Sequence, residues 1–156
     1  MSRVLGVDPG ASGALALLDT ETGTIDVVDM PVVTIKRGTR NVRQVQPALV
    51  VDIIKQLQPD RAVVERVAAM PGQGVSSMFA FGRSLGVVEG ALAGVGIPYT
   101  DVPPATWIKA MGVRGGKDGS RNRAIELYPR QAGLFARVKD DGRADATLIA
   151  TWGAAR

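Results

Sequence analysis

VLGVDPGASGALALLDTETGTIDVV, residues 4–28, is the most informative stretch of the sequence because it predicts three consecutive strands. The first strand stops at Asp8-Pro9-Gly10, a strong turn signal, and Glu21-Thr22-Gly23 forms a tight turn before the third. The predicted strands cover residues 4–7, 13–18 and 24–28. Short strands joined by tight turns predict an antiparallel meander.

After this meander the pattern changes to alternating helices and strands. Residues 30–44 are interpreted as a loop. Apolar spacing predicts helices over residues 45–57, 75–95, 103–111, 121–127 and 142–153, and strands over residues 62–64 and 97–102. This order predicts an α/β fold: a five-stranded mixed sheet with helices on both faces, the ribonuclease H-like arrangement. The length of 156 residues predicts one domain, residues 1–156.

The composition narrows the chemistry that the chain can perform. It contains no cysteine and no histidine, which excludes disulfides, the usual zinc sites, and catalytic Ser-His-Asp or Cys-His groups. Its hydrophobic fraction of 46% is enough for a core, yet no apolar run reaches the ~18 residues that span a bilayer. With no signal-peptide layout, we expect no membrane partner. The expected location is the cytoplasm of a bacterium or phage-infected cell, or an organelle after removal of a transit peptide.

Positive charge is concentrated in two segments. Residues 109–143 hold nine Lys and Arg residues against four acids, within a net charge of +4 for the chain. A second cluster contains no acid and comprises Lys36, Arg37, Arg40 and Arg43. Such segments indicate either a polyanionic partner, nucleic acid first, or an ordinary solvated surface.

Four carboxylates are expected to converge. Asp8 and Glu65 each end a strand, and the predicted fold places these two strands side by side and parallel. Asp141 and Asp145 are four residues apart and therefore lie on one face of the last helix. Alone, Asp8 fits a turn former, Glu65 a strand-end charge and Asp141 a helix cap, whereas Asp145 is harder to explain because its neighbours look buried. Together they suit Mg²⁺ or Mn²⁺, and two such ions ~4 Å apart hydrolyse phosphodiesters.

Four segments, in this order along the chain, carry a family resemblance. They are GVDPG (residues 6–10), VVE (63–65), FGRSLGVVEG (81–90) and GRADA (142–146). The chain resembles the RuvC family of Holliday junction resolvases over about residues 4–152. The stretch KDDGRAD, residues 139–145, is most similar to the phage and chloroplast branch.

The resemblance implies a homodimeric, Mg²⁺-dependent endonuclease that binds four-way DNA junctions and nicks two opposing strands symmetrically, with no small-molecule cofactor. It places Asp8, Glu65 and Asp145 on the metal-binding carboxylates of the family. Asp141 falls on the fourth position, with a spacing that differs from the bacterial members. Lys109, in the segment PATWIK, matches a family lysine near the metal site and is expected to be catalytic.

Further nucleic-acid contacts are expected from the basic segment and from one apolar side chain. Lys117 matches a second family lysine less closely, because its loop differs. Bacterial members insert an aromatic residue at the crossover, but residues 66–70 contain none, so Met70 or Phe79 is expected to replace it. The expected nucleic-acid contacts are Lys109, Arg114, Lys117, Arg121, Met70 and Phe79.

The helix over residues 75–95 is the expected dimer surface. It has more apolar positions than one core-facing stripe requires, and its glycines allow another backbone to approach closely. The alternative is that both of its faces are buried within one chain.

Three other functions fit parts of the sequence. An actin-like or sugar-kinase phosphotransferase fits the segment GVDPGASG, residues 6–13, but needs two copies of this fold. A related ribonuclease H-like nuclease would act on RNA or on another branched nucleic acid. An inactive junction-binding protein is disfavoured because all four carboxylates are present.

Overall fold

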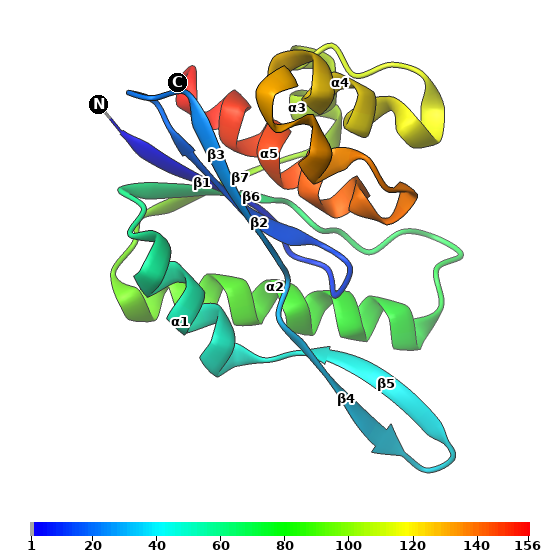
Figure 1. The fold of residues 1–156 in the computed structure, drawn as a ribbon. Helices are drawn as coiled ribbons and strands as arrows, with labels where there is room; N and C mark the ends of the chain where they lie inside the picture. The colour runs from blue at the N-terminus through cyan, green and yellow to red at the C-terminus, as the bar shows by residue number, and fades with distance from the viewer. Residues whose placement is uncertain (1) are drawn as a thin grey trace.

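The computed structural model describes residues 2–156 and is built on a five-stranded sheet in the order β3-β2-β1-β6-β7 (Figure 1). Its strands are β1 (Arg3–Asp8), β2 (Ala14–Asp19), β3 (Thr24–Asp29), β6 (Arg61–Glu65) and β7 (Tyr99–Val102). β1, β2 and β3 pair antiparallel, whereas β1 with β6 and β6 with β7 pair parallel. The sheet is therefore mixed, and both the predicted meander and the predicted neighbours β1 and β6 are confirmed.

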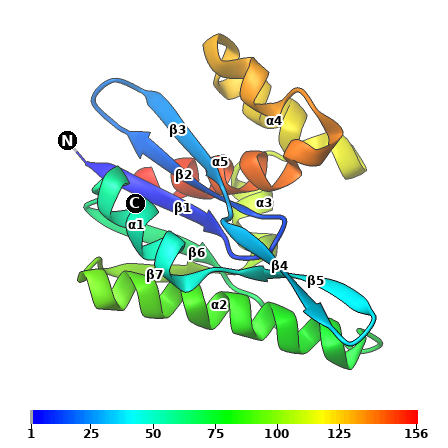
Figure 2. The same ribbon diagram turned by 60° about the horizontal axis from the view of Figure 1, so that its bottom comes forward.

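Helices cover both faces of this sheet (Figure 2). One face packs against α1 (Pro47–Leu57) and α2 (Val75–Val95), and the other against α3 (Pro104–Ala110), α4 (Gly119–Leu127) and α5 (Asp141–Ala154). Short 3₁₀ helices occur at Gly116–Asp118, Pro129–Phe135 and Val138–Asp140. The predicted fold class is confirmed. That residues 1–156 make up one domain stays a prediction.

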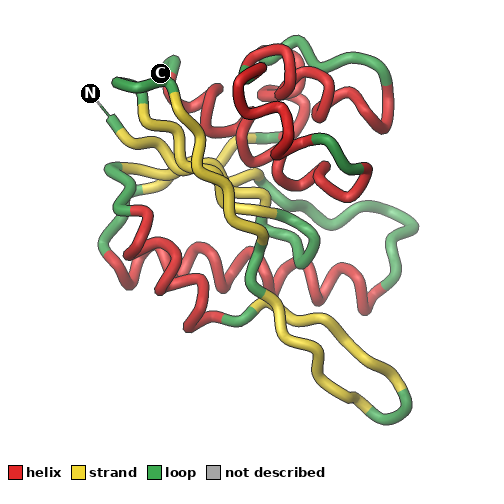
Figure 3. Tube along the Cα trace, viewed as in Figure 1, coloured by secondary structure: helices red, strands yellow, loops and turns green. Residues whose placement is uncertain are grey.

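The interpretation of residues 30–44 as a loop is wrong. They contain most of an antiparallel hairpin, β4 (Val32–Arg37) and β5 (Arg40–Val45), that projects away from the main sheet (Figure 3). Gly38 takes a φ of 61° in the two-residue turn, a conformation that favours glycine. The hairpin was missed because exposed charges occupy both faces of the ribbon, so the sequence lacks the apolar-polar alternation of a half-buried strand.

α2 has the predicted bounds but leaves much of its surface exposed. Its buried residues are Ser84, Val88, Ala91 and Leu92. Among the described residues, no atom outside the local helix backbone lies within 4 Å of a Cβ built on Gly82, Gly86 or Gly90. The alternative in which both faces are buried within one chain is therefore wrong. By length and apolar composition alone, α2 is the one helix in residues 2–156 that could cross a membrane. Its buried apolar residues belong to the core shared with α1.

Candidate active site

The alternation of side chains along β1 points Asp8 toward α5. Val4 lies in the core cluster shared with α5, whereas Leu5 and Val7 lie in the cluster shared with α1 and α2. Val4 and Leu5 therefore mark opposite faces of the sheet. Because side chains in a strand alternate with a period of two, Asp8 at the end of β1 projects on the α5 side.

The same reasoning places Glu65 beside Asp8. Val63 of β6 lies in the cluster shared with α5, and Val64 lies in the other cluster, so Glu65 also projects on the α5 side. Val7 pairs with Val64 in the parallel register. Asp8 and Glu65 are the next residues in the two strands, and they lie at adjacent strand ends, as predicted.

Two glycines allow α5 to lie close to this edge of the sheet. A Cβ on Gly6 would overlap the backbone of α5 at Ala146, and a Cβ on Gly142 would overlap the carbonyl oxygen of Ser12. Ser12 belongs to the loop that follows Asp8. The start of α5 is therefore held against the carboxyl end of β1.

This position of α5 brings the remaining two carboxylates to the same edge. Asp141 is the first residue of α5 and Asp145 lies one turn later on the same side of the helix. The neighbouring Asp140 is buried and takes a different role, because its carboxylate accepts hydrogen bonds from the backbone and guanidinium of Arg137.

Burial and neighbouring negative charges raise the pKa values of three of the carboxylates. Burial, together with the negative charges of Asp145 and Glu65, raises the pKa of Asp8 to about 7. Burial raises the pKa of Glu65 as well, and Asp145 adds to that effect. Burial and the charge of Asp141 raise the pKa of Asp145 to about 6. This edge of the fold therefore disfavours the negative charge of three carboxylates, and a bound cation would offset that cost.

Helices α3 and α4 supply hydrogen bonds that oppose this effect. The buried indole of Trp107 donates from Nε1 to Oε2 of Glu65 at 2.7 Å, which lowers the pKa of Glu65. A hydrogen bond with Ser120 lowers the pKa of Asp145 in the same way. The contact with Trp107 fixes a carboxylate that the strand backbone has already directed to this edge.

Arg121 is buried beside this site, which differs from the exposed position expected of a DNA contact. Its Nε lies 3.3 Å from Oδ1 of Asp141, and its guanidinium also pairs with Asp118. Nη1 donates to the carbonyl oxygens of Phe135 and Ala136 at 3.3 Å each. Arg121 could reach a phosphate only by breaking these contacts, and its expected contact with DNA stays a prediction.

The donor set of this edge fits a hard divalent cation, although the carboxylates are not closed around one point. In residues 2–156, no group of three or more acidic side chains is arranged as a ready-made metal site. The four carboxylates therefore lie along one edge of the sheet without forming a closed ligand set, and the expected metal site stays a prediction. Carboxylate oxygens whose negative charges lack compensation are suited to Mg²⁺ or Mn²⁺.

The other residues expected to contact nucleic acid are exposed. Lys109 stands two positions after Trp107 in α3, so it points to the side of that helix away from Glu65. Met70, in the loop after β6, is 64% exposed, and Phe79 of α2 is 76% exposed. Arg114 and Lys117 are exposed in the loop before α4.

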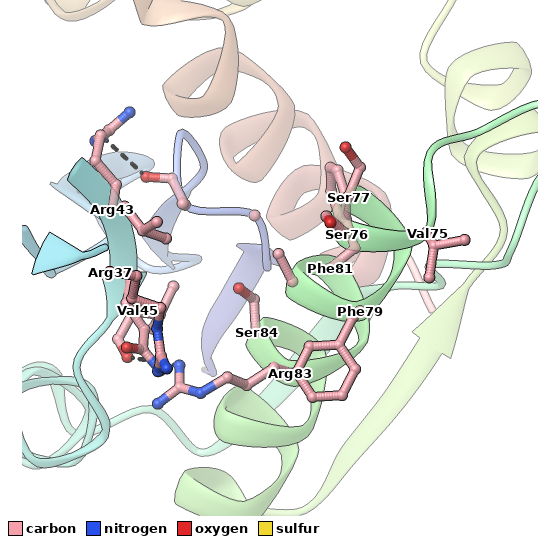
Figure 4. A pocket seen from close by; sticks show the side chains of 15 residues that line it. Arg37, Arg43, Val45, Val75, Ser76, Ser77, Phe79, Phe81, Arg83 and Ser84 are labelled. Atoms are coloured by element: carbon pink, nitrogen blue, oxygen red, sulfur yellow. Dashed lines mark hydrogen bonds between the residues drawn. The ribbon is translucent and has the colours of Figure 1, made fainter. Parts of the chain in front are cut away.

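A groove of about 810 Å³ lies between the hairpin and the first half of α2 (Figure 4). The α2 wall includes Phe79 and Phe81, and the hairpin wall includes Arg37 and Arg43. The loop after Asp8 also lines it. The groove therefore adjoins the segment that follows the first carboxylate.

Comparison with known proteins identifies the family. No protein-family model matches the chain. The crossover junction endodeoxyribonuclease RuvC of Chloroflexus aggregans is 32% identical over 152 residues, which cover 95% of this chain and 90% of that protein. The chain belongs to the RuvC family. The RuvC of Chloroflexus aurantiacus is 30% identical with the same coverage. The chloroplast Holliday junction resolvase of Chlamydomonas reinhardtii is 36% identical over 91 residues, which cover 57% of this chain and 10% of that protein.

Solved structures agree with this membership at the level of the fold. Thermus thermophilus RuvC in complex with a Holliday junction substrate matches with a TM-score of 0.66 and 17% identity, over 99% of this chain and 93% of that chain. The yeast mitochondrial Holliday junction resolvase matches with a TM-score of 0.52 and 18% identity, over 96% and 76% of the two chains. The expected ribonuclease H-like fold of the RuvC family is confirmed.

Sequence reasoning missed several residues that contact the carboxylates or the helix at this edge. Trp107 and Ser120 gave no signal, because their partners Glu65 and Asp145 are distant in the sequence. Gly6 did give a signal in the sequence, because a glycine inside a strand often marks the close approach of another backbone.

The contact of Gly142 gives the first testable prediction. We expect Gly142→Ala to lower the free energy of unfolding by about 1–3 kcal/mol, because its methyl group overlaps backbone that has little room to move. Cleavage should fall more than the loss of stability alone would cause, because α5 carries two carboxylates. Thermal melts and cleavage rates measure both effects. Gly133→Ala is the control, since a Cβ there meets no atom within 4 Å among the described residues; equal effects of the two changes would contradict the proposed packing.

The raised pKa values predict how stability depends on pH. The folded chain retains protons on Asp8 and Asp145 up to about pH 7 and 6, whereas an unfolded Asp loses its proton near 3.8. The native state therefore binds more protons between these values, and its stability should fall on the order of a few kcal/mol as pH rises from 4 to 7. Thermal melts with EDTA should show this loss. Mg²⁺ should reverse it at pH 8 and have little effect at pH 5, whereas a flat profile with no Mg²⁺ effect would contradict the assignment.

Proposed function

We propose that this chain is a divalent-metal-dependent endonuclease that resolves four-way DNA junctions. The observation that carries the proposal is the shared edge at which Asp8, Glu65, Asp141 and Asp145 lie, where the pKa values of Asp8, Glu65 and Asp145 are raised. Its RuvC-family relatives are named as crossover junction endodeoxyribonucleases, and one solved relative is in complex with a Holliday junction substrate.

Mg²⁺ is the proposed metal, two ions per site, with Mn²⁺ able to substitute. Asp8, Glu65 and Asp145 would hold the metal, and Asp141 would complete the ligand set from the exposed side. When bound, such ions activate water and stabilise the leaving oxygen of a phosphodiester. Trp107 keeps Glu65 oriented through its hydrogen bond, while Arg121 positions Asp141.

The DNA-contacting groups are proposed from exposure and position. Lys109 is exposed on the side of α3 away from Glu65, so its ammonium would stabilise negative charge on the cleaved phosphate only if the DNA passes over that side of the helix. Arg114 and Lys117 would contact DNA phosphates from the adjacent loop. Met70, an exposed apolar side chain outside α2, would insert at the crossover; the exposed Phe79 could take this part only if α2 did not form the interface between two copies.

We propose that two copies of the chain associate through α2. Its exposed face combines Val75 and Phe79, 79% and 76% exposed, with Gly82, Gly86 and Gly90, around which the described residues leave space. Exposed apolar side chains next to glycines suit close packing of a second helix. The proposed location is the cytoplasm of a bacterial or phage-infected cell, or an organelle after removal of a transit peptide. The proposed partner is junction DNA, and no small-molecule cofactor is proposed.

A substrate panel tests the proposed function. A mobile four-way DNA junction, a linear DNA duplex and an RNA of matching sequence should be incubated with the protein and Mg²⁺. We expect cleavage of the junction in strong preference to the other two substrates. Preferential cleavage of the RNA would instead favour the related nuclease class, and binding of the junction without any cleavage would favour an inactive junction-binding protein.

A further inference from the structure

The β4–β5 hairpin carries a set of cations that the rest of the fold leaves uncompensated. We call this hairpin the basic ribbon. All four cations are exposed, and across residues 2–156 no ion pair involves any of them. Its cations are Lys36, Arg37, Arg40 and Arg43.

The larger basic segment is different, because much of its charge is used inside the fold. Arg143 pairs with Asp29 at 2.7 Å, Arg137 pairs with Asp140, and Arg121 and Arg123 also have acidic partners. Acidic neighbours are therefore available to bind arginines elsewhere in this chain. In residues 2–156 no acidic side chain pairs with a cation of the basic ribbon, so the positive charge of the ribbon faces solvent.

The tip of the basic ribbon brings two like charges together. Arg37 and Arg40 are directly opposite each other across the antiparallel pair, next to the turn at Gly38. Like charges in this position destabilise a hairpin, and a ribbon of two strands is only marginally stable by itself. A polyanion bound at the tip would remove this repulsion, whereas a neutral or basic partner would not.

The base of the basic ribbon is attached to the loop that follows Asp8. Arg43 donates to the carbonyl oxygen of Ala11 at 3.1 Å and to Oγ of Ser12 at 3.2 Å. From α2, Arg83 donates to the carbonyl oxygen of Val45 at 3.0 Å. Figure 2 shows the ribbon leaving the sheet beside α2. The ribbon is therefore anchored at the catalytic edge while its tip extends beyond the fold.

We propose that the basic ribbon is a DNA-binding arm of the protein. It contacts the phosphate backbone of the junction duplex next to the cleaved strand. The proposal rests on the proposed function and adds to it the segment that holds the duplex. Lys36 faces one side of the ribbon and Arg37 and Arg40 face the other, so phosphates on both sides can be neutralised. Its strands of six residues extend ~20 Å, and phosphates follow each other every ~3.4 Å along a DNA strand. The contacts therefore lie within about six nucleotides of the cut.

A combined variant, Lys36→Ala/Arg37→Ala/Arg40→Ala, tests this arm. Because each phosphate contact contributes about one unit to the salt slope, we expect the slope of junction binding to fall by about three. Affinity near physiological salt should fall about 10- to 100-fold. The single-turnover cleavage rate at saturating protein should stay close to that of the parent. Hydroxyl-radical footprints should lose protection within about six nucleotides of the cut and retain it at the crossover.

Three controls show whether the loss of binding comes from the charge of this arm. Lys55→Ala, an exposed cation on α1 with no ion pair in the described structure, should leave the salt slope within one unit of the parent. Arg37→Lys/Arg40→Lys should bind like the parent, because it retains the charge. The melting temperature of the triple variant should equal or exceed that of the parent, because a like-charge pair has been removed.

The outcomes distinguish the arm from the proposed function itself. If the parent binds and cleaves junctions but the triple variant has the same affinity, salt slope and footprint, the proposal that the ribbon binds DNA is wrong. The proposed function then stands. If the parent neither binds nor cleaves junctions, the proposed function fails and the arm with it. If the triple variant changes the oligomeric state without DNA, the ribbon is an interface between copies of this chain, which also overturns the proposal.

Discussion

Asp8→Asn and Glu65→Gln are each expected to reduce junction cleavage below a few per cent of the parent rate while junction binding survives. The amide keeps the shape of each side chain but removes the negative charge that a divalent cation requires. Loss of an anion near DNA should even tighten binding slightly. Cleavage rates and gel-shift titrations on the same four-way junction measure the two properties separately.

A second measurement and a control sharpen this prediction. Asp8→Asn should raise the melting temperature of the metal-free protein at pH 8, because the charge of Asp8 is disfavoured in the fold. Asp52→Asn, an exposed carboxylate on α1, should change neither cleavage nor stability appreciably. If Asp8→Asn or Glu65→Gln still cleaves at a substantial fraction of the parent rate, the metal-site assignment is wrong.

Phe79→Asp is expected to convert a dimer into folded monomers that leave junctions singly nicked. The phenyl ring is 76% exposed on the proposed α2 interface, so a carboxylate there would have to be buried between two helices. Two nicks on opposing strands of a two-fold symmetric substrate call for two sites related by the same symmetry. Sedimentation without DNA should give twice the 16.4 kDa of one chain for the parent and one chain for the variant.

The choice of position matters for this test. Leu85 packs against the core and is a poor site, because an acid there would also destabilise the single chain. Val75→Asp provides a second exposed position on the same face, and Leu49→Asp, 44% exposed on α1, provides the control. A parent protein that remains monomeric on junction DNA and still makes paired nicks would contradict the dimer.

The sequence predicted the parts of the fold in which local pattern and tertiary role agree. β1 and β6 are short apolar runs that end in an acid, and strand pairing places Asp8 and Glu65 at adjacent ends. α2 was predicted with its observed bounds because a Gly/Pro loop over residues 66–74 precedes a long apolar helical segment. In these elements the residues that favour the local strand or helix are also the residues that pack in the core.

The parts that the sequence did not predict depend on contacts between distant residues. Trp107 supports Glu65 from 42 positions away, and nothing near either residue indicates the pairing. The charge of Arg121 indicated DNA, whereas its burial beside Asp141 indicates an internal role. Charge counted along a sequence does not distinguish cations that pair within the fold from cations that face solvent.

Paired incision of a single junction tests the central claim most directly. A four-way junction labelled on both opposing strands should be mixed with excess protein in EDTA and started with Mg²⁺, beside a linear duplex of the same sequence. We predict two nicked linear duplexes, cut at symmetry-related phosphates within one binding event, and no comparable cleavage of the linear duplex. Cleavage of one strand only, or equal cleavage of the linear duplex, would contradict the account.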